Sequence, residues 1–423
     1  MIEIDFRKLV KVPGFEYFDK WDREPNPFRQ FKFKMLRGVD PKWYVSSLML
    51  ANNPIGSIRP QQLGGAAGSS IYLEDSITSC VCEGLERYSS INYFMSDTPH
   101  MQNVDYSKGY IRCADEEVGA PVSFKSHGVE VPIEHSQVFR LIDDTPDYLP
   151  YELVHLGYQK KDLNTLFFSP ISTGCAFQID KLHALKRGLE EVIERHALMF
   201  WWYDNNRTER SINLGDCTHF DIYERIKRLR AKKLQVRLYE ISPIPGFPVV
   251  FCMLQGQQFP YFSCGASCCT DINHAIIKAI DEAVSIRYMS EFIGPRQIET
   301  NNFSWVHNLE DHMMLYANWK DSPIIQSIMG KQSPSFDFNN YKPIVIQDMD
   351  DLRFQAKKLQ LQGFDVYYKD LTISEIKPVG VVYRVVIPQM MPLTQFHGTR
   401  WLSSLLTDNR TLADINPYPQ PFS

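Results

Sequence analysis

Residues 73–94, LEDSITSCVCEGLERYSSINYF, decide how the rest of the chain is interpreted. Apolar residues recur in this stretch at the spacing of one helix face, and its first turn is acidic, which together predict an α-helix. Ser79, Glu83 and Glu86 are spaced i, i+4 and i+7, so they lie on one narrow stripe of that helix. The stretch therefore predicts a helix that turns one hydroxyl and two carboxylates to the same side.

Two more helices with acidic faces are predicted further along the chain. Apolar spacing indicates one over about 180–202 and another over about 271–292, where Asp271 and Asn273 are suitable N-caps. The Glu-x-x-Glu-Arg pattern of the first helix, which ends in Arg87, returns on the second. The charged residues concerned are Glu191, Glu194 and Arg195 on the second helix, and Glu282 and Arg287 on the third.

These carboxylates are suited to binding magnesium. Like charges three residues apart on a helix repel, so they either face water or are neutralised by a cation. Magnesium prefers a few carboxylate oxygens completed by water and phosphate, and separate helices can supply them. The candidate ligands are Glu83, Glu86, Glu191, Glu194 and Glu282. The candidate phosphate donors are Arg87, Arg195 and Arg287, with the amides of the glycine-rich stretch QQLGGAAGSS at 61–70. Solvated helix faces often carry the same pattern, and the spacing alone favours neither interpretation.

The remaining segments predict an α/β fold in which helices cover the sheets. The first sixty residues are rich in aromatics, Pro and Arg and indicate an irregular segment packed on the core, and 61–70 indicates a flexible loop. Predicted strands at 235–241, 248–254 and 261–266 form a meander that leads into the third helix. A βαβ unit is predicted over 343–346, 350–360 and 364–371, followed by a strand at 379–387.

Composition narrows the class of protein. The chain has 423 residues, of which 44% are hydrophobic and 22% charged, and its net charge of −5 is well mixed, which favours a globular protein without a nucleic-acid partner. The N-terminus lacks the pattern of a secretory signal, and no apolar run is long enough to cross a bilayer, so we expect a cytoplasmic protein without a membrane partner. Cys264, Cys268 and Cys269 lack paired C-x-x-C spacing, which favours buried thiols over zinc.

The motifs resemble those of the YcaO family, in particular the azoline-forming cyclodehydratases of the thiazole/oxazole-modified microcin type. The run from Ser79 to Arg87 matches S-x-x-x-E-x-x-E-R at every fixed position. The segments STGCAF at 172–177 and 184–197 are similar to the second acidic helix and its preceding turn, and GASC at 265–268 precedes a segment similar to the third. The resemblance covers roughly 60–423 in the family's order.

This resemblance implies a YcaO fold with an ATP site between the acidic helices, and ATP and Mg²⁺ as cofactors. It implies an N-terminal segment at 1–60 packed on a YcaO domain at 61–423. The implied enzyme is an ATP-dependent peptide cyclodehydratase that phosphorylates backbone amide oxygens and converts Cys, Ser or Thr of a ribosomally made precursor peptide to thiazoline or oxazoline. Thioamide or amidine formation, or a non-catalytic peptide-docking scaffold, are the alternatives. The implied partners are the precursor peptide, a leader-binding E1-like or RRE protein and a flavin dehydrogenase.

The chain ends in PYPQPFS, which is similar to the proline-rich tail of azoline-forming members. Pro417, Pro419 and Pro421 favour a stiff, extended backbone. The resemblance implies that this tail reaches the active site, with the carboxylate of Ser423 as candidate general base.

The sequence also departs from the family pattern around the phosphate-binding loop. Members often carry G-K-G before the first acidic helix, whereas this chain has Gly-Gly-Ala at 64–66, so Arg59 is the candidate substitute. Ser285 replaces a glutamine of the third helix. Arg384 matches a family arginine that enters a strand, and with Ser79 it completes the predicted nucleotide-binding residues.

Overall fold

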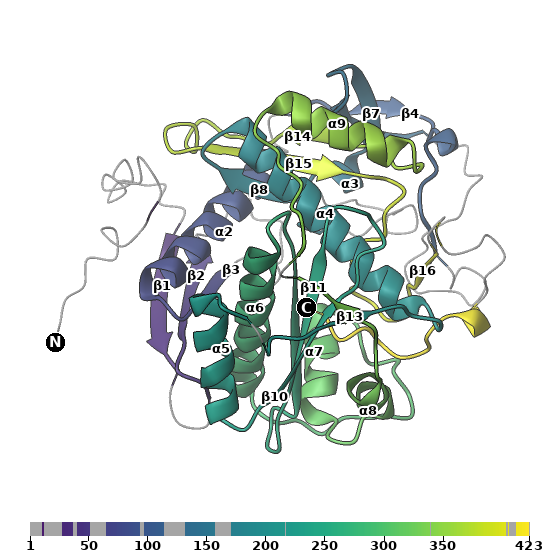
Figure 1. The fold of residues 1–423 in the computed structure, drawn as a ribbon. Helices are drawn as coiled ribbons and strands as arrows, with labels where there is room; N and C mark the ends of the chain where they lie inside the picture. Colours follow the sequence, from purple (N-terminus) through teal and green to yellow (C-terminus); the bar gives the residue numbers. More distant parts are fainter. Residues whose placement is uncertain are drawn as a thin grey trace.

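Three long helices cross the centre of the molecule (Figure 1). The protein is represented by a computed structural model that describes residues 11, 28–36, 40–50, 65–93, 97–113, 132–156, 171–215, 217–338, 340–402, 405 and 412–422. The helices are α2 (Leu73–Tyr93), α4 (Lys181–Tyr203) and α6 (Ile272–Ile293), which confirms the three predicted segments. Asp180 and Asp271 cap α4 and α6 through their side chains, as expected of N-cap carboxylates.

A five-stranded sheet lies between α4 and α6. Its order is β12-β11-β10-β9-β13, and the predicted meander is confirmed as three antiparallel strands. The strands are β9 (Arg210–Ile212), β10 (Gln235–Glu240), β11 (Val249–Gln255), β12 (Phe262–Cys268) and β13 (Ser335–Phe336). Gly265 allows α6 to approach β12 closely, because a Cβ there would stand 2.4 Å from the backbone nitrogen of Ala283.

A second sheet covers the other side of α4, with the order β4-β6-β14-β15-β8 and β7 paired to β6. Its strands are β4 (His100–Gln102), β6 (Ile133–Arg140), β7 (Pro146–Pro150), β8 (Cys175–Gln178), β14 (Tyr367–Asp370) and β15 (Val381–Val386). The predicted βαβ unit is wrong: α9 (Met349–Gln360) is present, but 343–346 is not a strand and β14 runs antiparallel to both neighbours. Ile344 instead packs as a loop residue against the turn at Gly246.

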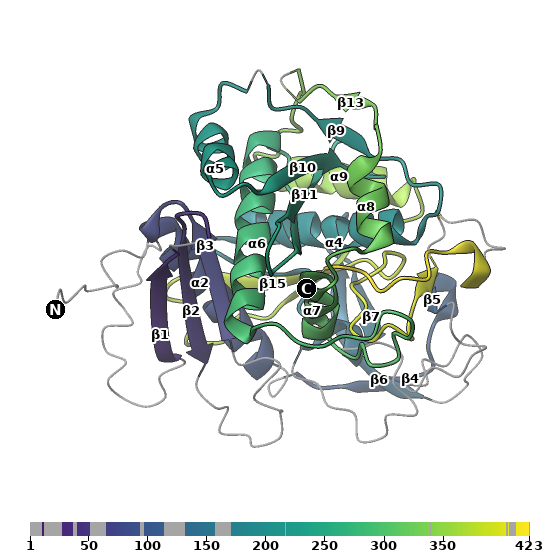
Figure 2. The same ribbon diagram turned by 90° about the horizontal axis from the view of Figure 1, so that it is seen from below.

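The N-terminal part contains a three-stranded sheet where we expected irregular chain and a loop. The strands are β1 (Phe28–Met35), β2 (Tyr44–Leu50) and β3 (Gly65–Ser70), all antiparallel. The small residues of β3 have a packing role rather than a loop role, because a Cβ at Gly68 would stand 2.1 Å from the carbonyl oxygen of Ser76 on α2. Figure 2 shows α6 between this sheet and α7 (Leu309–Asn318).

Four further groups of elements complete the fold. They are α3 (Tyr151–Val154), α5 (Phe220–Ala231), α8 (Pro323–Gly330), and the strand pair β5 (Arg112–Cys113) and β16 (Trp401–Leu402). In the part of the chain that the structure describes, no helix is both long and apolar enough to cross a bilayer.

Candidate active site

The carboxylates of α2, α4 and α6 lie close enough to act on one another. Burial is the first cause that raises the pKa of Glu86, Glu191, Glu194 and Glu282, and the charge of another member adds to each shift. Glu191 acts on Glu86, Glu194 on Glu191, and Glu282 on Glu194. With Glu83, which also raises the pKa of Glu86, they form what we call the acidic cluster. The prediction that three separate helices converge is therefore confirmed.

Strand backbones hold one oxygen of several of these carboxylates. The amide of Ala67 on β3 donates to Glu83 Oε2 at 2.9 Å, and the amide of Ala266 on β12 donates to Glu282 Oε2 at 2.6 Å. The amide of Cys268 donates to Glu194 Oε2 at 2.9 Å. The described part of the glycine-rich stretch thus orients a carboxylate through Ala67, and phosphate binding by its amides stays a prediction.

Two of the predicted arginines lie within the acidic cluster. Arg87 Nη2 donates to Glu83 Oε1 at 3.0 Å, and Arg195 Nε lies 3.6 Å from Glu194 Oε1 and 3.9 Å from Glu191 Oε1. The charges of Glu83 and Glu86 raise the pKa of Arg87, against the effect of burial. Both guanidiniums therefore stay charged beside the carboxylates.

A third arginine, Arg187, belongs to the same site although the motifs did not indicate it. Its Nη1 donates to the carbonyl of Cys268 at 3.1 Å, and the charges of Glu194 and Glu190 raise its pKa against the effect of burial. Glu190 is buried and accepts the amide of Thr270 at 3.2 Å. The available signal was spacing, because Arg187 stands four residues before Glu191 and seven before Glu194, on the same helix face.

Arg287 does not face the acidic cluster, contrary to the prediction. Its Nε donates to Asp40 Oδ1 at 3.2 Å and its Nη1 to the carbonyl of Pro260 at 2.5 Å, and only 3% of the residue is exposed. Five residues separate it from Glu282, which rotates it about 140° around the helix axis. Arg287 therefore joins α6 to the N-terminal part and to the start of β12.

Two further predicted nucleotide contacts have partners of other kinds. Arg384 is buried in β15 and donates to the carbonyl of Ile171 at 2.7 Å. Burial raises the pKa of Cys175, and the charge of Arg384 opposes this shift while the charge of Glu86 adds to it. Arg384 thus lies near the acidic cluster, and its contact with nucleotide stays a prediction. Ser79 Oγ accepts a hydrogen bond from Lys278 Nζ at 3.2 Å. Arg59 lies outside the described residues.

The C-terminal tail runs into the centre of the protein (Figures 1 and 2). Pro417 is exposed, whereas Pro419, Pro421 and Phe422 are buried. Backbone carbonyls of the tail accept bonds from side chains of α4, α7 and β12. The bonds are Trp202 Nε1 to Tyr418 O at 2.9 Å, Tyr316 Oη to Pro419 O at 2.5 Å, His312 Nδ1 to Gln420 O at 2.8 Å and Cys264 Sγ to Pro421 O at 3.2 Å.

The end of the tail approaches the acidic cluster through Cys264. Burial, followed by the charge of Glu282, raises the pKa of the Cys264 thiol. Cys264, which donates to the carbonyl of Pro421, therefore lies within electrostatic range of the acidic cluster. The ring of Phe422 packs edge-on against Trp202 and Phe251, with centroids 6.0 and 5.5 Å apart. Ser423 lies outside the described residues. Side-chain donors of α4, α7 and β12 therefore hold the tail beside the cluster.

The donor set fits a magnesium-bound polyphosphate. Burial raises the pKa of Glu86 and Glu194 although Arg87 and Arg195 oppose the shift, so a further cation would stabilise their ionised forms. Arg87 Nε is buried without a hydrogen-bond partner among the described residues. Across the same residues, no three His, Cys, Asp or Glu side chains are already gathered as a metal-ligand set. The roles of Glu83, Glu86, Glu191, Glu194 and Glu282 as metal ligands therefore stay a prediction.

Replacing Glu194 with Gln is expected to stabilise the nucleotide-free protein at high pH. Burial, assisted by the charge of Glu282 and opposed by Arg195, raises the pKa of Glu194 from 4.5 to about 7. The folded state therefore binds this proton more tightly than the unfolded chain does. Ionising Glu194 costs the folded state nothing below the unfolded pKa, because the group is protonated in both states. The cost grows as pH rises and is complete above about 7. Calorimetry should find Tm higher by on the order of 2 °C near pH 8 and unchanged near pH 4.

The matched control for this measurement is Glu224→Gln on α5. That carboxylate pairs with Lys227 at 3.0 Å on the protein surface, so its removal should not stabilise the fold. If the Glu194→Gln protein melts at or below the wild-type temperature near pH 8, ionised Glu194 does not destabilise the fold and the prediction is wrong.

Comparison with solved structures finds the same fold in several proteins. A heterocyclase in complex with substrate and cofactor matches with a TM-score of 0.71 and 18% identity over 97% of this chain, and the chain spans 57% of that protein's length. YcaO from Methanopyrus kandleri bound with AMPPCP and Mg²⁺ matches with a TM-score of 0.58 and 14% identity over 89% of both chains. The E. coli microcin synthetase McbBCD complex matches with a TM-score of 0.62 and 16% identity, over 92% of this chain and 96% of that chain. The search of curated proteins found no match.

A family model agrees with these likenesses and covers most of the chain. The model described as YcaO cyclodehydratase, ATP- and Mg²⁺-binding, matches residues 67–391, which include all three acidic helices. By this match, and in agreement with its fold and its acidic cluster, the chain belongs to the YcaO family.

Proposed function

We propose that this chain is an ATP-dependent cyclodehydratase that forms thiazolines or oxazolines from Cys, Ser or Thr of a ribosomally made precursor peptide. The observation that carries the proposal is the acidic cluster, built by three helices around Arg87, Arg187 and Arg195, with the proline-rich tail buried next to it. The family description supports ATP and Mg²⁺ as the reagents of such a site. The similar structures include a heterocyclase with bound substrate and a microcin synthetase, which supports a peptide as the acceptor.

The proposed reaction has three balanced steps. A thiol or hydroxyl of the peptide attacks the preceding backbone carbonyl carbon and gives up its proton, which leaves a negative charge on the former amide oxygen. This oxygen takes the terminal phosphoryl group of ATP, and ADP leaves. The attack has already closed the ring, and the amide N–H then loses its proton as phosphate departs, which forms the C=N bond of the azoline. The oxygen lost from the peptide leaves as phosphate.

In this scheme the protein positions the reactants and compensates charge. Glu83, Glu86, Glu191, Glu194 and Glu282 would hold Mg²⁺, which neutralises charge on the phosphates when bound. Arg87 and Arg195 would donate to phosphate oxygens, and the backbone amides of β3 and β12 hold Glu83 and Glu282 in place. The terminal carboxylate of Ser423 is our candidate for the base that removes a proton from the peptide.

The chain should act together with other proteins. We propose a separate leader-binding E1-like or RRE partner that presents the precursor, and a flavin dehydrogenase that oxidises the azolines. The microcin synthetase that shares this fold is itself described as a multi-protein complex, which supports the first of these partners in general terms. The use of ATP supports the cytoplasm as the place of reaction.

Mass spectrometry of the reacted precursor tests the proposal. Purified chain, partner and precursor with Mg·ATP should release ADP, and the peptide should lose the mass of one water for each ring. A peptide that gains mass in the presence of sulfide would indicate thioamide formation, one that takes up an amine would indicate an amidine, and the absence of ADP release would indicate a docking scaffold. Each of these three outcomes would refute azoline formation by this chain.

A further inference from the structure

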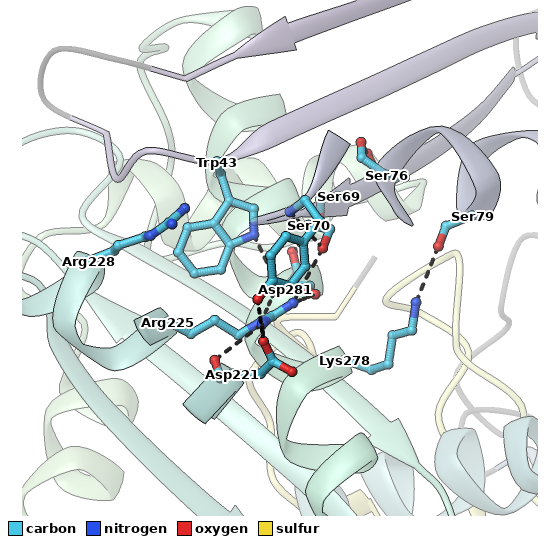
Figure 3. A network of polar contacts seen from close by, with 12 residues as sticks. Trp43, Ser69, Ser70, Ser76, Ser79, Asp221, Arg225, Arg228, Lys278 and Asp281 are labelled. Carbon is cyan, nitrogen blue, oxygen red and sulfur yellow. Dashed lines mark hydrogen bonds and ion pairs between the residues drawn. The ribbon is translucent and has the colours of Figure 1, made fainter. Parts of the chain in front are cut away.

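A buried ion pair joins Arg225 of α5 to Asp281 of α6 (Figure 3). Arg225 Nε donates to Asp281 Oδ1 at 2.9 Å and its Nη2 donates to Asp281 Oδ2 at 2.8 Å, so the guanidinium holds both carboxylate oxygens. The indole nitrogen of Trp43 donates to Asp281 Oδ1 at 2.9 Å. Three N–H groups from two other parts of the chain therefore fix one side chain of α6, and none of these residues belongs to a motif.

The same residue of α6 is also tied to β3. Ser69 Oγ donates to the backbone carbonyl of Asp281 at 2.5 Å. Ser69 lies two residues after Ala67, whose amide holds Glu83. In the chain, Asp281 immediately precedes Glu282. Asp281 therefore connects α6, which carries Glu282, with β3, which holds Glu83 in place.

The ion pair fixes the rotation of α6 about its own axis. Neighbouring residues of an α-helix point about 100° apart, so Asp281 faces α5 while Glu282 faces Ala266 of β12. A glutamate carboxylate lies about 6 Å from the helix axis, and a rotation of about 10° would therefore move it by about 1 Å. A shift of this size matters at a metal site, because its ligands must be held within about 0.5 Å of their working positions.

Stability alone does not account for a charged pair at this place. Arg225 and Asp281 are both buried, and burying two charges can cost as much free energy as their attraction returns. Apolar side chains of similar size often give equal or greater stability in such a position. What the ion pair supplies and apolar packing does not is direction, since the planar guanidinium binds a carboxylate in a fixed orientation.

We propose that the Arg225–Asp281 pair positions the acidic cluster for magnesium, by setting the rotation of α6 and its distance from β3. Both are positioning residues that act through Glu282 and, by way of β3, through Glu83. The inference rests on the proposed function, since it requires that the acidic cluster binds the metal together with ATP.

Binding of Mn²⁺ with the non-hydrolysable nucleotide AMPPCP tests this role without relying on turnover. Mn²⁺ takes the place of Mg²⁺ because its electron paramagnetic resonance spectrum reports both the bound fraction and the geometry of the ligands. The double variant Arg225→Met/Asp281→Asn removes both charges together, so that neither remains buried and unpaired. It should melt near the wild-type temperature but raise the Kd for Mn²⁺ by about 10–100-fold, the usual effect of losing a group that orients a metal ligand.

Two smaller changes and a control accompany the double variant. Arg225→Lys keeps the positive charge but not the fork of donors, so it should weaken Mn²⁺ binding to a smaller extent. Ser69→Ala removes only the bond from β3 to α6 and should raise the Kd by about 2–10-fold, the value of one hydrogen bond. The control is Arg210→Met/Glu240→Gln, which removes an ion pair of 2.6 Å between β9 and β10 and should leave Mn²⁺ binding as in wild type.

The outcomes separate this inference from the proposed function. If wild type binds Mn²⁺ with AMPPCP and the double variant gives the same Kd and spectrum, the ion pair is only structural; the inference is then wrong while the proposed function stands. If the double variant does not fold, wild-type binding by Ser69→Ala refutes the inference and weaker binding supports it. If the control weakens binding as much as the double variant does, the effect is not specific to α6 and the inference is again wrong. If wild type itself binds no Mn²⁺ with AMPPCP, both fail together.

Discussion

Replacing Glu83 with Gln is expected to lower ATP turnover by about a thousandfold while the protein stays folded. Glutamine retains an oxygen that can accept the amide of Ala67, now 2.9 Å from Glu83 Oε2, so α2 should keep its contact with β3. It removes the negative charge that would help to hold magnesium, and it releases Arg87 from its 3.0 Å ion pair. Glu282→Gln should behave in the same way, because the amide of Ala266 supports Glu282 from β12.

The measurement is steady-state release of ADP in the presence of precursor and partner, with circular dichroism to confirm folding. Glu224→Gln is the matched control, since that carboxylate lies on α5 and, among the described residues, pairs with Lys227 and Arg228. Wild-type turnover by both Glu83→Gln and Glu282→Gln would exclude these carboxylates from the metal site. Loss of turnover in the control would mean that general changes of surface charge, rather than the acidic cluster, govern the assay.

The three acidic helices could be predicted because two independent patterns coincide in them. Apolar periodicity gave their bounds to within about two residues, and Asp180 and Asp271 began α4 and α6 as N-caps. The carboxylates then fell on one face of each helix, and the packing of α4 between two sheets brought these faces together. That the three acidic faces meet could be established only from the tertiary packing, because the spacing of the carboxylates was equally consistent with solvent-exposed helix faces.

Other features depend on contacts that no local pattern reports. The stretch Gly65–Ser70 has the composition of a loop, yet its small side chains allow β3 to pack against α2. A Cβ atom at Gly68 would stand 2.1 Å from the carbonyl oxygen of Ser76, which is too close for any larger residue. Arg287 follows the family motif in sequence but is turned by helix geometry towards Asp40. Arg187 shares one face of α4 with Glu191 and Glu194, but tertiary packing is what shows that this face belongs to the site.

Moving the C-terminal carboxylate is expected to stop ring formation without weakening the binding of Mg·ATP. Two variants achieve this and leave the described tail contacts in place: deletion of Ser423 alone, and extension of the chain by two glycines. Each should lower the rate of heterocycle formation by about 10²–10⁴-fold, the usual contribution of a general base, with an unchanged Kd for Mg·ATP. The comparison isolates the carboxylate because Trp202, His312 and Tyr316 still bond the backbone of the tail.

A longer deletion, of 421–423, has a second effect that the two smaller changes avoid. Phe422 is buried against Trp202 and Phe251, and loss of a buried phenylalanine costs about 3–5 kcal/mol, so this variant should also melt at a lower temperature. Mass spectra of the precursor and calorimetry of each variant separate the two effects. Normal amounts of azoline from the Ser423 deletion would remove the carboxylate from the mechanism, and the buried tail would then serve to close the core beside the acidic cluster rather than to take the proton.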